Sequence, residues 1–209
     1  MLNHLADFFL PVAHIWVILS LLLCFLLWIG RAFFMQSLCL VLLDMIVNVA
    51  LKGTFKIPLN GWLHGGYAFP SGHMQITTVF YGWLALHVPS VVFRGLMLVL
   101  CIGEGFGLIH YDYHNLKDVI AGFISALLLI GLYRGTLGFF RQATPWVLVC
   151  FSTLCMAYNA LCYQHATPSH AVQSYELLLL VLLCERVLSR NGRKTQDWDP
   201  IHSIKVSFL

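Results

Sequence analysis

The chain of 209 residues is too apolar for an ordinary water-soluble domain, because 59% of its residues are hydrophobic and only 10% are charged. About a quarter of the residues of a typical globular domain are charged. The net charge of +3 is too small to indicate a nucleic-acid partner, and we expect none. The composition predicts an all-α, polytopic membrane helix bundle without a separate soluble domain.

Seven apolar stretches follow one another along the chain, most of them close to the roughly 20 residues that a helix needs to cross a bilayer. They are Leu10–Gly30, Phe33–Leu51, Met74–Val88, Val91–Ile109, Leu116–Tyr133, Pro145–Tyr163 and Ala171–Leu188. The third is short and needs residues from the preceding loop. If only one of the last two crosses the membrane, six spans remain. We therefore predict six to seven transmembrane helices within residues 1–188, and a polar cytoplasmic tail at 189–209.

The basic residues predict the orientation of this bundle. Nine of the twelve fall in loops that seven spans put on one side, or near the C-terminus: Arg31, Arg94, Arg134, Arg141, Arg186, Arg190, Arg193, Lys194 and Lys205. The positive-inside rule places that side in the cytoplasm. The other three, Lys52, Lys56 and Lys117, lie beside polar motifs that then face outward. This predicts an integral protein of the bacterial inner membrane whose motifs face the periplasm.

Lys52 follows the second apolar stretch directly. Its ammonium group either neutralises an anion at the membrane edge or snorkels from the span to the interface. The loop that follows, Lys52–Ser71, contains Trp62 and Tyr67, residue types that favour the membrane–water interface. A loop of this length that keeps its own aromatic residues is more often functional than a simple connection.

The tetrapeptide Pro70-Ser71-Gly72-His73 comes immediately before the third stretch. Ser71 can cap the helix, and Gly72 lets the backbone approach an anion closely. The free N–H groups of a helix start make a seat for phosphate, toward which His73 would project from the first turn. The alternative is an ordinary Pro-Ser helix start with an interfacial histidine.

His114 and Asp118 stand at the beginning of the fifth stretch with i, i+4 spacing. They share a face if the helix begins near His114. The carboxylate could then accept a hydrogen bond from Nδ1–H and leave Nε2 free to attack. An ionisable residue at the start of an apolar span indicates function, although Asp118 could instead cap the helix beside an unrelated histidine. Together with His73, this pattern predicts phosphoryl transfer through a histidine.

Further polar and small residues lie inside the spans. Asp44 and Asn48 have i, i+4 spacing in the second stretch, and Glu104 lies in the fourth. We expect these three to pair across helices or to line a polar cavity below the site. The fourth stretch also contains three glycines that would allow close helix packing: Gly103, Gly105 and Gly107.

His110, Asp112 and His114 alternate along the chain. In an extended loop they would point the same way, as metal ligands can. No second cluster of carboxylate ligands accompanies them, so we expect no metal.

In its motifs the chain resembles the type 2 phosphatidic acid phosphatase superfamily of integral membrane lipid phosphatases. The family pattern is a Lys followed at a fixed interval by Arg-Pro, then Pro-Ser-Gly-His, then Ser-Arg followed by a His with an Asp four residues on. Lys52, Pro70 to His73, and His114 with Asp118 match it in order, spacing and position at span ends. The resemblance covers about Leu51 to Gly122.

The resemblance implies roles for these residues. His114 would be the nucleophile that forms a phosphohistidine, and Asp118 would orient it. His73 would protonate the leaving alkoxide and later activate water. The oxygens of the phosphate would be held by Lys52, Ser71 and the backbone of Gly72. No metal or organic cofactor is needed on this route.

Two pairs of positions depart from the family pattern. The Arg-Pro positions hold Leu59-Asn60, and the Ser-Arg positions hold Gly107-Leu108. Both family arginines are therefore missing, and with them the forked donors that stabilise charge on phosphoryl oxygens. Other donors near the motifs could replace them, namely Lys56, Lys117, His64 and His110.

The sequence thus predicts a membrane phosphatase that hydrolyses a lipid phosphate, either a phosphomonoester or a diphosphate, at the outer membrane face. Its partner is the lipid substrate within the bilayer: phosphatidic acid, phosphatidylglycerol phosphate, a polyprenyl diphosphate or a lipid A phosphate. The oligomeric state is left open. The alternatives are a phosphotransferase between lipids and an inactive lipid-binding or scaffold protein of the same fold. A small transporter is disfavoured because the polar residues gather at one face.

Overall fold

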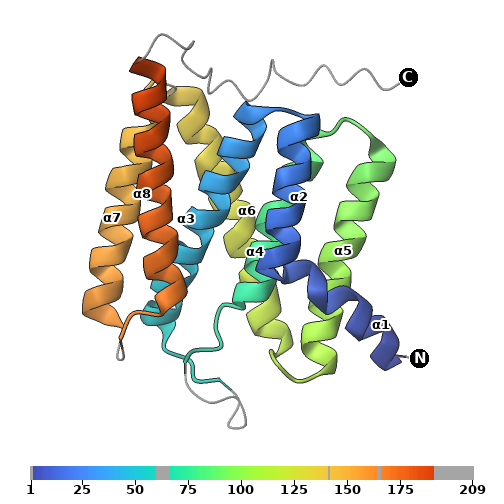
Figure 1. Cartoon of the computed structure of the whole chain (residues 1–209). Coiled ribbons are helices and arrows are strands. Elements are labelled where there is room, and N and C mark those ends of the chain that lie inside the picture. The colour runs from blue at the N-terminus through green and yellow to red at the C-terminus, as the bar shows by residue number, and fades with distance from the viewer. Residues whose placement is uncertain (1, 60–65, 141, 164–165, 191–209) are drawn as a thin grey trace.

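The computed structural model describes residues 2–59, 66–140, 142–163 and 166–190, and the regular elements of this part of the chain are all helical (Figure 1). In chain order they are α1 (Leu2–Phe9), η1 (Leu10–Ala13), α2 (Ile15–Trp28), α3 (Arg31–Phe55), α4 (Gly72–His87), α5 (Val91–His110), α6 (Leu116–Phe139), α7 (Thr144–Cys162) and α8 (Ser169–Arg190). Asn60, Trp62, His64 and the expected tail from residue 191 onward lie outside the described residues.

Each of the seven predicted spans overlaps one helix from α2 to α8, and the prediction of an all-α membrane bundle is confirmed. Among the described helices, α3, α5, α6 and α7 are long and apolar enough to cross a membrane, and the bent pair formed by α1–η1 and α2 would make a fifth span. Helix α4 has only 16 residues and takes its first turn from the preceding loop, as the short third stretch predicted.

Helix α3 occupies the centre of the bundle. It packs against α2, α4, α7 and α8, and every side chain from Met35 to Asp44 is buried. In Figure 1, α3 passes between α8 and α2. The outer helices expose apolar side chains such as Leu98 and Leu161, as a lipid-facing surface requires. The central position of α3 lets one helix supply several polar groups to the same site.

The prediction of a single helix over Leu10–Gly30 is wrong. The chain breaks at His14, whose backbone is extended (φ −65°, ψ 130°), and the segments on either side are bent by 59°. Pro11 lies in the first turn of η1. Because proline has no N–H, it cannot continue the hydrogen bonds of α1, and the apolar pattern alone did not reveal this interruption.

The segment α1–η1 packs against a glycine face of α5. A Cβ atom at Gly103 would lie within 2.3 Å of the Phe9 ring, and one at Gly107 would lie 3.0 Å from Leu10 Cγ. Gly105 faces α6 instead. The expectation that these glycines allow close packing is confirmed.

The ends of the helices that carry the motifs gather at one end of the bundle. Figure 1 shows the end of α3, the starts of α4 and α6 and the end of α5 at its lower end. Segments that are more than 60 residues apart in the chain can therefore contribute to one site.

Candidate active site

The start of α4 is built as the sequence predicted. Ser71 is the N-cap residue, and its Oγ accepts a hydrogen bond from the Met74 N–H at 3.4 Å. Gly72 lies against α3, since a Cβ atom there would approach Asn48 Oδ1 to 3.0 Å. His73 stands in the first turn and is exposed. The helix start therefore offers free N–H groups beside an accessible imidazole.

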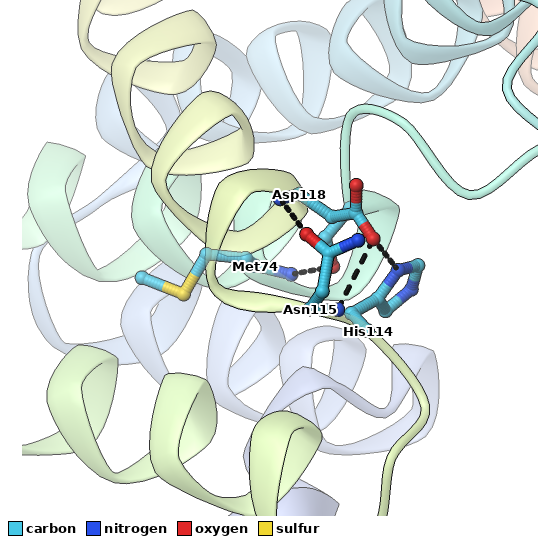
Figure 2. Close-up of polar contacts among 5 residues, drawn as sticks. Met74, His114, Asn115 and Asp118 are labelled. Atoms are coloured by element: carbon cyan, nitrogen blue, oxygen red, sulfur yellow. Dashed lines mark hydrogen bonds and ion pairs between the residues drawn. The ribbon is translucent and has the colours of Figure 1, made fainter.

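The start of α6 differs from the prediction. The helix begins at Leu116, and Asn115 and Asp118 form a capping box in which Asp118 Oδ2 accepts a hydrogen bond from the Asn115 N–H at 3.1 Å. His114 Nδ1 faces the same oxygen at 3.6 Å (Figure 2), which is too long for a hydrogen bond. The predicted hydrogen bond between His114 and Asp118 is therefore not formed in this structure, although the carboxylate oxygen that caps the helix also faces the imidazole.

The two motifs contact each other through the backbone. The Ser71 N–H donates to the carbonyl oxygen of Asp118 at 3.0 Å. A Cβ atom at Gly122, one turn further along α6, would lie 2.6 Å from the carbonyl oxygen of Ser71. Only glycine allows this approach, so α6 rests directly on the start of α4 and brings His114 near His73.

His114 is 7% exposed, and its surroundings favour the neutral imidazole. Burial lowers the pKa of His114 below its ordinary value, and the charge of Lys52 lowers it further. The charge of Asp118 opposes this shift, and that of His73 supports it. A neutral imidazole has a free lone pair, which is the form that can act as a nucleophile.

Although part of the His73 side chain reaches solvent, its pKa is lowered as well, first by desolvation of the ring among the surrounding helices and then by the charges of Lys52 and His14. Basic groups from α3, α4 and the break before α2 therefore act on one another electrostatically. Such a set of mutually repelling groups favours the binding of an anion.

A cavity of about 340 Å³ opens beside these groups. It is bounded by the break before α2, by α3, by the start of α4 and by the start of α8. The polar side chains that line it are His14, Asp44, Asn48, Lys52, His73 and His170.

A buried hydrogen-bond network lies at the inner side of the cavity. Asn48 Nδ2 donates to Gln75 Oε1 at 2.9 Å, and Gln75 Nε2 donates to Asp44 Oδ1 at 2.7 Å. The expectation that Asp44 and Asn48 pair across helices and line a polar cavity is confirmed. Glu104 behaves differently, because among the described residues neither of its carboxyl oxygens has a hydrogen-bond partner.

Three lining or supporting residues were missed by sequence reasoning. His14 lay inside an apolar stretch, where an ionisable residue is itself a signal of function. His170 precedes the last stretch and carries no motif. Gln75 follows the Pro-Ser-Gly-His motif in α4, and nothing in the sequence indicates that it bridges two α3 side chains.

The proposed replacement cations lie elsewhere in the described structure. The residues lining this cavity do not include Lys56, Lys117 or His110. Lys56 caps the end of α3 in a left-handed conformation, Lys117 is exposed, and His110 Nε2 lies 2.8 Å from Asn3 Oδ1. Within the described ranges, no group of three or more His, Cys, Asp or Glu side chains could hold a metal ion.

At the position where the family resemblance expects an arginine in the third motif, Leu108 is 1% exposed and belongs to the hydrophobic core. Its neighbour Gly107 is covered by Leu10. The amino-terminal segment thus fills the space beside Gly107 with an apolar side chain, and Leu108 lies within the apolar core.

Residues 48–142 match the model of the PAP2 superfamily, and this match supports membership of the chain in that superfamily. Over 120 residues the chain is 27% identical to a protein of Saccharomyces cerevisiae (strain ATCC 204508 / S288c) named dolichyldiphosphatase. The aligned region covers 48% of this chain and 50% of the relative. The chain therefore spans about half the length of that relative. No solved structure matches it.

Proposed function

We propose that this protein is an integral membrane phosphatase that hydrolyses a lipid phosphate through a phosphohistidine on His114. The observation that carries the proposal is the meeting of two imidazoles and one ammonium group at one end of the bundle. Lys52 and His73 both act electrostatically on His114, and Lys52 and His73 line one cavity. The match to the PAP2 superfamily supports the same chemistry.

In the first step, Nε2 of His114 attacks phosphorus. A P–N bond forms as the P–O bond to the lipid breaks, and the leaving oxygen takes a proton from His73. The negative charge of the bound phosphate raises the proton affinity of His73, which offsets the opposing effect of Lys52. Lys52 and the N–H groups at the start of α4 bind the phosphoryl oxygens.

In the second step, a water molecule attacks phosphorus and gives its proton to His73. The P–N bond breaks, its electron pair returns to Nε2 of His114, and inorganic phosphate leaves. Asp118 faces Nδ1 of His114 and stabilises the positive charge that develops on the ring during both steps. If a lipid hydroxyl takes the place of water, the same steps make the protein a phosphotransferase.

The position of the site supports a lipid as the substrate. The motif-bearing helix ends lie at one end of the bundle (Figure 1), which suits a lipid whose tail stays in the bilayer while its headgroup enters the cavity. The name of the yeast relative favours a polyprenyl diphosphate as the first substrate to test. By the positive-inside rule, the site faces the side of the membrane opposite to the cytoplasm. In a bacterium, that side is the periplasm.

The decisive experiment measures phosphate release by the purified full chain from a polyprenyl diphosphate and from phosphatidic acid in mixed micelles. We expect turnover by the wild type, loss of at least ~10³-fold in His114→Ala, and little change in His4→Ala, whose side chain is exposed on α1. A chemically trapped phosphohistidine should appear in the wild type only. Turnover by His114→Ala at the wild-type rate would refute the proposal.

The inactive scaffold remains the second candidate because of Leu108, whose apolar surroundings leave no room for a cation at that position. It predicts no phosphate release and no trapped phosphohistidine from any lipid phosphate, although the purified protein is folded. The same experiment therefore decides between the two functions.

A further inference from the structure

Two histidines outside the family motifs line the cavity from opposite sides of α3. His14 lies at the break between η1 and α2, and His170 lies in the first turn of α8. Both α2 and α8 pack against α3, which carries Lys52. The cavity thus has imidazoles on two walls in addition to His73.

The position of His14 is fixed by the packing around it. The Val12 carbonyl oxygen accepts a hydrogen bond from the Tyr81 hydroxyl at 3.2 Å, which ties the residues before His14 to α4. Leu10 is held against Gly107 of α5, and Ala13 is buried. His14 itself is exposed, so the backbone at the break is anchored while the side chain is free to reach a ligand in the cavity.

The basic side chains around the cavity favour the binding of an anion. Lys52 acts on both His73 and His170, and His14 acts on His73. The acidic side chain among the lining residues, Asp44, accepts a hydrogen bond from Gln75 and lies at the inner side. Four basic groups therefore surround one opening, and the carboxylate there is already engaged with a neutral amide.

We propose that His14 and His170 are substrate-binding residues that donate hydrogen bonds to the phosphate oxygens of the lipid. From the two walls of the cavity they supply hydrogen-bond donors to the phosphate. The family resemblance would assign this role to arginine. The inference rests on the proposed function for the identity of the ligand as a lipid phosphate. The recognised chemistry is a phosphate group, which free inorganic phosphate shares.

The test uses the full chain in detergent and two readouts. One is the affinity for inorganic phosphate, measured by titration calorimetry, and the other is the KM and kcat for the lipid phosphate. His14→Ala and His170→Ala remove a donor, whereas His14→Gln and His170→Gln keep one N–H donor. His4→Ala is the matched control, because it changes an exposed histidine in the same amino-terminal segment.

We expect each alanine variant to weaken phosphate binding and to raise KM about 10-fold, as the loss of one hydrogen bond to a charged group predicts. The change in kcat should be smaller, because these residues bind oxygens that are charged before and after the reaction. The glutamine variants should recover most of the affinity. Circular dichroism of each variant checks the fold, and His14→Leu or His170→Leu replaces an alanine variant that does not fold.

The outcomes separate this inference from the proposed function. Unchanged phosphate affinity and unchanged KM in both alanine variants overturn the inference, even if His114→Ala abolishes turnover. Conversely, a wild type that releases no phosphate from lipids but binds inorganic phosphate through His14 and His170 supports the inference and rejects the phosphatase. Glutamine variants as weak as the alanine variants would also overturn it, because donor chemistry would then not matter.

Discussion

The Asp118 carboxylate accepts a hydrogen bond from the Asn115 N–H and also faces His114 Nδ1 at 3.6 Å. The sequence presented capping the helix and orienting the histidine as alternatives. In the structure, the Asp118 side chain caps the helix and also lies in position to orient His114. A shift of less than 1 Å would convert the contact into a hydrogen bond, which substrate binding could bring about.

These two roles can be separated by substitution. Asp118→Asn keeps an oxygen that can accept from the Asn115 N–H but removes the charge, whereas Asp118→Ala removes both. We expect Asp118→Ala to lower stability by about 1 kcal/mol, the usual loss of a cap, and Asp118→Asn to lower it less. Both variants should lose lipid phosphatase activity by ~10²-fold or more, measured as phosphate release beside thermal unfolding.

Full activity in Asp118→Asn would show that capping alone explains this residue. Equal activity losses with equal loss of stability in the two variants would show that the helix start, rather than the charge, supports the reaction.

The residues of the site were predictable where a motif carries its own local structure. Ser71 caps α4 as expected, because N-capping depends on neighbours within one turn. His14 and His170 were not predictable, because they meet only through the packing of helices that are far apart in the chain. Burial of Leu108 in the core likewise depends on the packing of helices and not on the residues next to it in the chain.

At the scale of the helices, the contact between α6 and the start of α4 holds the two histidine motifs together. It depends on Gly122, which brings α6 against the Ser71 carbonyl oxygen. Gly131 lies in the same helix, but a Cβ atom there would have no neighbour within 4 Å. The two glycines form a matched pair for testing this contact.

We expect Gly122→Ala to destabilise the protein by about 1–3 kcal/mol, because a well-packed contact must open, and to reduce phosphate release by ~10-fold or more, because small displacements of catalytic groups are costly. Gly131→Ala should be neutral or stabilising by up to about 1 kcal/mol, since alanine favours the helix. Thermal unfolding and activity assays check both variants. Wild-type activity in Gly122→Ala would mean that this contact does not position the site.

Most helices were predicted from apolar length alone, because a membrane span needs many consecutive apolar residues. The α5 prediction, Val91–Ile109, differs from the structure by one residue at its end. The break at His14 was missed because the apolar residues continue through it, and only Pro11 marked it. Helix α1 was also missed, since its eight residues are too few to give a span signal.

At the scale of the whole molecule, the distribution of Lys and Arg predicts which way the bundle lies in the membrane. Arg31 at the start of α3 and Arg94 in the first turn of α5 lie at the helix ends opposite to those that carry Lys52 and His114. This arrangement is consistent with the positive-inside prediction.

Green fluorescent protein fused after Leu209 should fluoresce in bacterial cells, because it folds in the cytoplasm, whereas a periplasmic reporter enzyme at the same position should stay inactive. The opposite pair of results would reverse the orientation and put the site on the cytoplasmic face. His114→Ala, with the same fusions, controls for any effect of activity on insertion.

The cavity has walls from both the beginning and the end of the described chain, with His14 on one side and His170 on the other. During synthesis, the segments carrying His73 and His114 emerge well before α8 does. The pocket is therefore open on one side until the last helix has inserted and packed onto α3. If this cavity is the phosphate site proposed above, a partly made chain would hold His73 and His114 and still lack one wall of that site, so dephosphorylation would begin only when assembly is finished.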